Sequence, residues 1–194
     1  MAAQEAAFEV GRLAERLAQG YYAHVIAIEV ARDPRSNALV GSAPAGQAVP
    51  VSYVARNDGT QHVFDSQHYL NEARTHPELI GELPRTWLVG SLLTVGDALT
   101  KHDYFDHAPI LELLCHLRNG VAHGNTFHFS VGGLKRLSRY PAHNKAAHVR
   151  SDKKTEFEIS ASLEKAPVLF DFMGPGDVLD VLQSAALHLI RNVK

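Results

Sequence analysis

Residues 113–124 read Leu113-Leu114-Cys115-His116-Leu117-Arg118-Asn119-Gly120-Val121-Ala122-His123-Gly124. Apolar residues fill the first half of this run, and an arginine, an asparagine and a histidine gather near its end. Upstream, Asp106 suits an N-cap and Pro109 suits the first turn of a helix. Because glycine is common just beyond the last helical residue, Gly124 is where this helix should end. The run therefore predicts a buried helix that carries polar side chains at its C-terminal end.

Three further segments have the apolar spacing of helices with one buried face. They are residues 5–32, which Asp33-Pro34 should end, residues 84–101, and residues 174–190. Gly20 weakens the first of these segments and marks either a kink or a break into two helices. Four helical segments of this length predict a mainly α-helical bundle.

Two segments, 33–65 and 125–172, have little helical character. Asn57-Asp58-Gly59-Thr60 forms a turn between two short apolar runs and predicts a hairpin, with Ser66 as the N-cap of a short helix after it. In the second segment, alternating polarity in 125–131 and 155–161 predicts strands, and 168–172 offers a third. We expect one domain over residues 1–194, a helical bundle with a small β insertion between the helix of residues 113–124 and the C-terminal helix.

Composition narrows the class of protein. The length of 194 residues suits one domain, and the hydrophobic share of 45% is ordinary for a folded soluble chain. A single cysteine excludes an internal disulfide framework and a cysteine-rich zinc site. The first residues lack the features of a signal peptide, and no apolar run is long enough for a membrane span. These features predict a soluble, cytoplasmic protein without membrane contact.

Charge is unevenly distributed along the chain. Residues 134–154 carry seven basic side chains and one acid, Asp152, a net of +6, although the whole chain carries −2. Such an asymmetry indicates that the basic segment binds an anionic partner. A solvated loop without a partner is the simpler alternative. Phe127 and Phe129 precede this segment and Tyr140 lies within it, so it combines cations for phosphates with rings for bases. We expect it to bind RNA through Lys135, Arg136 and Arg139.

The geometry of a regular helix constrains the polar run. Asn119 and His123 are four positions apart and share a face, whereas Arg118 lies roughly 140° around the helix from His123. Arg118 can therefore join them through its long side chain, through a frayed helix end near Gly120, or by facing a second subunit. A purely structural role is the alternative, since arginine and histidine both stabilise the negative end of a helix dipole.

The run from Arg118 to His123 resembles the signature of HEPN ribonucleases, in which an arginine and a polar residue precede a histidine near a helix end. Here four residues separate Arg118 from His123, and Asn119 directly follows the arginine. The resemblance covers residues 84–194 and the N-terminal helix. It implies a homodimer with a composite site, RNA cleavage to a 2′,3′-cyclic phosphate, and a toxin or defence role with an antitoxin protein as a candidate partner. Some HEPN toxins carry a tyrosine two positions after the histidine, where a paired enzyme adds AMP; Asn125 stands there in this chain.

The residue types suit metal-independent cleavage of RNA. A base must remove the proton of the 2′-OH and an acid must protonate the leaving 5′-oxygen, and histidine serves in both roles because its ordinary pKa is about 6.5. An arginine fork binds the phosphate, and Asn119 either orients His123 or donates to the phosphate. Arg118, Asn119 and His123 are therefore the candidate catalytic residues, without a metal or a cofactor. A HEPN-like scaffold that binds RNA, nucleotide or a protein without cutting is the alternative.

Other histidines have weaker interpretations. His102 and His107 lie with Asp103 and Asp106 in a loop rich in capping residues, but they lack the spacing of known zinc motifs. His116 lies seven residues before His123, on the same helical face, and either lines the same groove or forms a hydrogen bond in the core.

Overall fold

Helices dominate the structure because the apolar residues of this chain recur with helical spacing. The computed structural model describes residues 2–36, 51–150 and 155–192. Contacts divide the chain into two units: the first combines Met1–Tyr21 with Arg85–Lys194, and the second is Tyr22–Pro84. The expectation of a single domain over 1–194 stays a prediction. A mainly α-helical fold with a small β element is confirmed.

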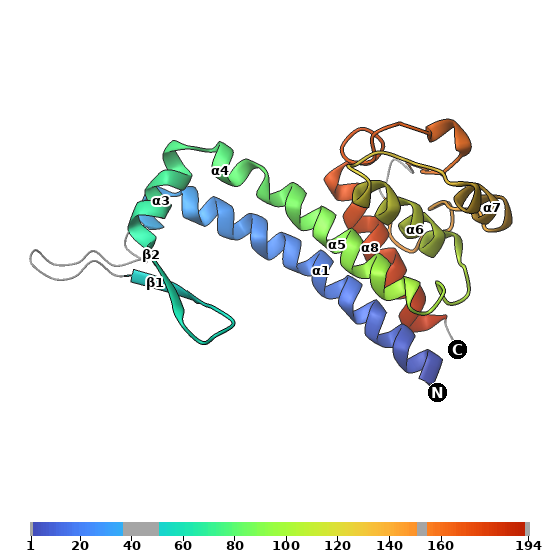
Figure 1. Ribbon diagram of the computed structural model, residues 1–194, viewed down its shortest axis with the longest axis horizontal. Coiled ribbons are helices and arrows are strands. Elements are labelled where there is room, and N and C mark those ends of the chain that lie inside the picture. Colours follow the sequence, from blue (N-terminus) through green and yellow to red (C-terminus); the bar gives the residue numbers. More distant parts are fainter. Residues whose placement is uncertain (1, 37–50, 151–154, 193–194) are drawn as a thin grey trace, which may run out of the picture. The chain divides into compact units, whose positions relative to one another are not determined.

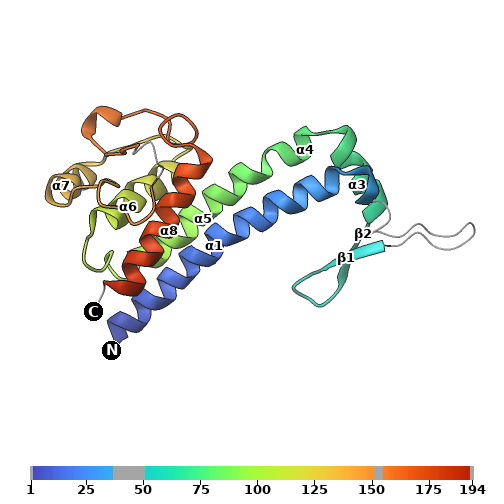
Figure 2. The ribbon, with the colours of Figure 1, turned by 180° about the vertical axis from the view of Figure 1, so that it is seen from behind.

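Long helices form the frame of the first unit (Figure 1). These are the N-terminal part of α1 (Ala2–Arg32), most of α5 (Leu83–Thr100), α6 (Pro109–Ala122) and α8 (Pro175–Arg191). Each of these helices was expected from its apolar stripe. Their shared core includes several side chains that are fully buried, among them Leu88, Leu92, Leu99, Leu111, Leu113, Leu114, Leu117, Leu182 and Leu189. α6 packs against α8, and Figure 2 shows this pair from behind.

Glycines allow α1 to approach its neighbours closely. A Cβ added at Gly11 would lie 2.9 Å from Ile190 of α8, and one added at Gly20 would lie 2.6 Å from the indole of Trp87 in α5. The same indole donates a 3.0 Å hydrogen bond from Nε1 to the Leu17 carbonyl. α1 runs unbroken through Gly20, so the prediction of a break there is wrong, and the glycine makes room for Trp87 instead.

The segment between α6 and α8 differs from its prediction. The strands expected in 125–131, 155–161 and 168–172 appear only as isolated bridges, Thr126↔Pro167, His143↔Glu158 and Leu169↔Met173. Residues 131–139 form a helix, α7 (Val131–Arg139), and Ala161–Leu163 form a 3-10 turn, η2. Ser130 caps α7 by accepting a 3.0 Å hydrogen bond from the Gly133 amide. Gly132 and Gly133 therefore lie in the first turn of this helix.

The second unit contains the one sheet found in the described part of the chain. Strands β1 (Val51–Ala55) and β2 (Gln61–Asp65) pair antiparallel, from Val51↔Asp65 to Ala55↔Gln61, so the predicted hairpin is confirmed. Asp65 rather than Ser66 caps α3 (Ser66–Thr75), by accepting a hydrogen bond from the His68 amide. The short helix α4 (Glu78–Gly81) and the 3-10 turn η1 (Pro34–Ser36) complete this unit.

Arg74 ties α3 to the end of α1 within the second unit. Its guanidinium donates to the carbonyls of Ala31 and Asp33, at 3.2 and 3.0 Å, and to the Ser36 hydroxyl at 2.5 Å. The bond to Ala31 satisfies a carbonyl in the last turn of α1, which has no intrahelical partner. Residues 37–50 lie outside the described part of the chain.

Candidate active site at the end of helix α6

The polar residues of the predicted motif lie on the last turn of α6 and just beyond it. The helix ends at Ala122 and His123 is its C-cap, with its amide donating to the carbonyls of Asn119 and Gly120. Gly124 follows with a φ of +77°, a conformation that a residue with a side chain rarely adopts. His123 is exposed, whereas Leu117 and Gly120 are buried. The buried helix therefore presents its polar end to solvent, as its sequence predicts.

Arg118 is held by an aspartate that sequence reasoning missed. Its Nε and Nη2 donate to the same Asp97 carboxylate oxygen at 2.8 and 2.6 Å. Asp97 is the one acidic residue of α5, and that was its only signal in the sequence. The guanidinium therefore points toward α5, and the Arg118 side chain remains 30% exposed. This direction agrees with the 140° offset from His123 that a regular helix imposes.

Asn119 acts on Arg118 rather than directly on histidine. Its Oδ1 accepts a 3.1 Å hydrogen bond from Arg118 Nη1, and its Nδ2 lies 3.9 Å from the Cys115 sulfur. Burial raises the pKa of the Cys115 thiol, so this sulfur is neutral. The amide thus fixes one edge of the guanidinium while Asp97 fixes another.

A second histidine lies next to His123. The rings of His123 and His128 have centroids 6.4 Å apart and are nearly perpendicular. His128 was not predicted as a site residue. It is half exposed, and its Nδ1 lies 3.1 Å from the Glu164 carboxylate. The structure therefore brings two imidazoles together at the exposed end of α6.

The backbone that carries His128 is firmly anchored. Phe127 is fully buried, its amide donates to the Ala166 carbonyl at 2.9 Å, and its carbonyl accepts from the Lys165 amide at 2.8 Å. The Asn125 amide group bonds both the N–H and the carbonyl of Leu169. Extended backbone between buried Phe127 and partly buried Phe129 turns the intervening His128 outward. The alternation that predicted a strand in 125–131 is thus present in the side chains, although only one bridge forms.

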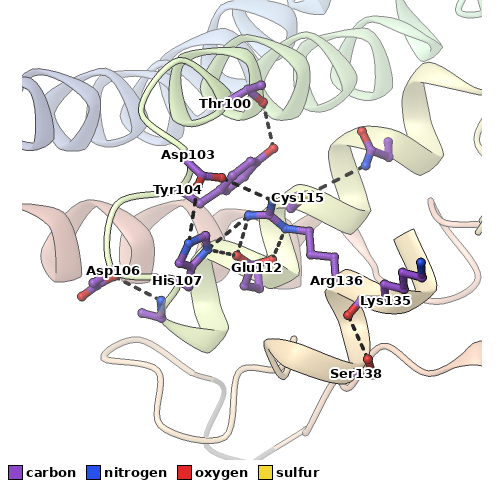
Figure 3. A network of polar contacts seen from close by, with 12 residues as sticks. Thr100, Asp103, Tyr104, Asp106, His107, Glu112, Cys115, Lys135, Arg136 and Ser138 are labelled. Carbon is purple, nitrogen blue, oxygen red and sulfur yellow. Dashed lines mark hydrogen bonds and ion pairs between the residues drawn. The ribbon is translucent and has the colours of Figure 1, made fainter. Parts of the chain in front are cut away.

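The predicted RNA-binding residues Lys135, Arg136 and Arg139 all belong to α7, but their environments differ. Arg136 Nε and Nη2 donate to the two oxygens of Glu112 at 2.6 and 2.7 Å. The Glu112 side chain is fully buried, so this bidentate pair holds α7 to α6. Figure 3 shows the guanidinium facing that carboxylate.

Aromatic rings surround this ion pair. His107 Nδ1 lies 2.7 Å from Glu112, and the His107 ring stacks on Tyr140 with centroids 3.8 Å apart. The Arg136 guanidinium lies 4.5 Å from the centroid of the Tyr104 ring, and burial raises the pKa of the Tyr104 hydroxyl. We call Tyr104, His107, Glu112, Arg136 and Tyr140 the Glu112 cluster. The Arg136 guanidinium is bound within this cluster, so Lys135 and Arg139 are the exposed cations of α7.

An open hollow of about 280 Å³ lies over this cluster and is lined by Asp103, His107, Lys135, Arg136, Arg139 and Tyr140. The three basic residues of the prediction therefore share one hollow. Arg139 lies 4.9 Å from the Tyr140 ring centroid, and Lys135 is exposed. Lys153 and Lys154 of the basic segment lie outside the described residues.

The other histidines take structural positions. His116 is buried, packs edge-on against Phe129, and has no hydrogen-bond partner for Nε2 among the described residues. Burial lowers the pKa of His116. The His102–His107 loop directs His107 to Glu112 and stacks His102 on Phe105. Within residues 2–36, 51–150 and 155–192, no group of three or more histidine, cysteine or acidic side chains is arranged to hold a metal ion.

No family model, curated protein or solved structure matches this chain. Among the helices that the structure describes, none has the length and apolar character to cross a membrane.

Proposed function

We propose that this chain is a metal-independent endoribonuclease of the HEPN type, with its site at the end of α6. One observation carries the proposal: Arg118 and His123 lie within one and a half turns at the open end of a buried helix, the arginine aimed by Asp97 and Asn119. The partly exposed guanidinium of Arg118 can donate to the phosphate, and the exposed imidazole of His123 can exchange protons with the 2′-OH.

In the proposed reaction the 2′-oxygen attacks the adjacent phosphorus, and the bond from phosphorus to the 5′-oxygen breaks. His123 takes the proton of the 2′-OH or gives one to the 5′-oxygen. Arg118 stabilises the charge that develops on the phosphoryl oxygens, and such stabilisation is commonly the largest contribution to rate. The products are a 2′,3′-cyclic phosphate and a 5′-OH, and neither a metal nor a cofactor is required.

RNA would approach along α7. Lys135 and Arg139 remain exposed, so we assign the RNA contacts mainly to these two cations. Arg136 takes a smaller share in this proposal because Glu112 already neutralises it. If each cation binds one phosphate of single-stranded RNA, Lys135→Ala and Arg139→Ala should each lower the slope of log K against log salt by about 0.7. An unchanged slope in both variants would refute this route.

A non-catalytic HEPN-like scaffold is the second candidate, and the Asp97 contact favours it. Both bonds from Arg118 to Asp97 occupy donors that a phosphate would otherwise use. In this version the chain binds RNA, nucleotide or a protein partner without cutting. A homodimer, a toxin or defence role and an antitoxin partner belong to the nuclease proposal.

One assay separates the two candidates. The purified protein is incubated with RNA in EDTA over a range of protein concentrations, beside Arg118→Ala, His123→Ala and the control His102→Ala. The nuclease predicts cleavage that both site variants lose and the control retains. Binding without cleavage at every concentration supports the scaffold.

A further inference from the structure

The acid–base chemistry of RNA cleavage needs two proton-transfer groups, and this chain brings two histidines together at one place. The His123 and His128 rings lie 6.4 Å apart, centroid to centroid, at an angle of 88°. Both are accessible to solvent. An acid or base acts through a hydrogen bond of about 3 Å from one of its ring nitrogens, and the exposed His123 side chain can turn toward a group that His128 also reaches. A single phosphodiester group could therefore contact both imidazoles.

Contacts around His128 keep it in a defined orientation. Glu164 Oε1 lies 3.1 Å from His128 Nδ1, and Glu164 Oε2 accepts a 2.8 Å hydrogen bond from the Phe129 amide. The carboxylate therefore bridges the ring and the backbone next to it. Buried Phe127 and its bonds to 165–166 hold the other side of this residue.

Glu164 is suited to accept from a histidine at neutral pH. The backbone hydrogen bond from Phe129 and the contact with His128 lower the pKa of Glu164, so the carboxylate is ionised. An ionised carboxylate accepts the Nδ1 proton and leaves Nε2 free for proton transfer. A buried aspartate orients the histidine of a serine-protease triad by the same contact.

We propose that His128 is the second catalytic histidine of the site, that it acts in the same chain as His123, and that Glu164 positions it. This inference rests on the proposed ribonuclease function. It differs from the composite site that the HEPN resemblance implies, because one chain now offers both an acid and a base.

The roles follow from the contacts. His123 Nε2 or Nδ1 takes the proton of the 2′-OH while the 2′-oxygen forms its bond to phosphorus. As the bond from phosphorus to the 5′-oxygen breaks, doubly protonated His128, with Glu164 at Nδ1, gives its Nε2 proton to that oxygen. Exchange with water then removes the proton from His123 and returns one to His128. Protons and charge balance without a further reactant.

A sulfur-substituted substrate tests the role of His128 as the acid. Two RNA oligonucleotides are compared in EDTA, one with an ordinary linkage and one with a bridging 5′-sulfur, which leaves without protonation. His128→Ala should slow cleavage of the ordinary linkage by roughly 10²- to 10⁴-fold and should leave cleavage at the 5′-sulfur nearly unchanged. His123→Ala should slow both. Circular dichroism and thermal melting establish that each variant folds, and His128→Gln provides a second variant.

Each result decides a different question. If the wild-type chain cleaves neither substrate, the proposed function fails and the inference falls with it. If the wild type cleaves and folded His128→Ala matches it, or loses both substrates equally, only the role of His128 fails. Mixing His123→Ala with His128→Ala should restore nothing if both groups act within one chain, and recovered cleavage would overturn that claim.

Glu164→Gln examines the positioning residue separately. Since the protonated ring loses its carboxylate partner, the alkaline limb of the pH–rate profile should move to lower pH. A lower rate without any change of profile would assign Glu164 a structural role only.

Discussion

Gly96 lies directly against the stem of Arg118. A Cβ added at Gly96 would be 2.4 Å from Arg118 Cγ and 2.6 Å from its Cβ, both far shorter than a real contact. These atoms belong to the base of the arginine, so the side chain cannot swing clear without moving its own backbone. Gly96 therefore makes room for Arg118 beside Asp97, the next residue of α5.

Gly96→Ala should displace Arg118 from Asp97. We expect a loss of about 1–3 kcal/mol in the free energy of unfolding, as for other overpacked sites, together with a fall in RNA cleavage toward that of Arg118→Ala. Gly90→Ala is the matched control in the same helix, because nothing lies within 4 Å of its added Cβ. That control should gain up to about 1 kcal/mol from helix propensity and keep its activity. Urea unfolding measures the stability of both variants, and the cleavage assay measures their activity. Equal stability and equal activity of Gly96→Ala and Gly90→Ala would contradict the prediction.

Asp97→Asn should distinguish the orientation of the Arg118 guanidinium from its binding to RNA phosphate. Removing the carboxylate frees Arg118 for phosphate, so RNA affinity should rise and its salt slope should steepen by up to about 0.7. The same change loosens the guanidinium, so kcat should fall. Stability should change by less than about 1 kcal/mol, because the pair is partly exposed. Fluorescence titration and single-turnover kinetics measure the two effects, and unchanged values for both would leave Asp97 without either role.

Local pattern was sufficient to predict most of the fold. α1, α5, α6 and α8 each carry a long apolar stripe, and the β1–β2 hairpin carries its turn signal. α7 was missed because none of its residues is fully buried and because two glycines lie in its first turn. Its attachment depends on the pair between Glu112 and Arg136, which are 24 positions apart, a relationship that no local period encodes.

The candidate site also contains residues that the sequence predicts and residues that only the fold brings together. Arg118, Asn119 and His123 were found because they are neighbours in the sequence at a predicted helix end. Asp97 lies 21 positions before Arg118, and Glu164 lies 36 positions after His128. Such partners come together only when α5 packs on α6 and when the segment before α8 folds back on 125–129. Sequence reasoning therefore found the group on one helix and missed those that the fold brings to it.

Arg136→Ala should lower the free energy of unfolding far more than a surface substitution does. It leaves the carboxylate of Glu112 buried without its guanidinium, a change that typically costs about 3–5 kcal/mol. Lys135→Ala on the same helix is the control and should change stability by no more than about 0.5 kcal/mol. Chemical denaturation of both variants gives the comparison. If Arg136→Ala were as stable as Lys135→Ala, the pair with Glu112 would not hold α7 in solution.

His116 should make the protein less stable in mild acid. Burial lowers the pKa of His116 below its ordinary value of about 6.5, so the unfolded chain binds a proton in a pH range where the folded chain does not. The free energy of unfolding should therefore fall as the pH drops from about 6.5 through the lower pKa of the folded state. His116→Leu cannot take up this proton and should lose less stability between about pH 8 and pH 5 than the wild type does. Urea unfolding at several pH values, with His102→Leu as an exposed control, measures the difference, and parallel curves for the wild type and His116→Leu would contradict it.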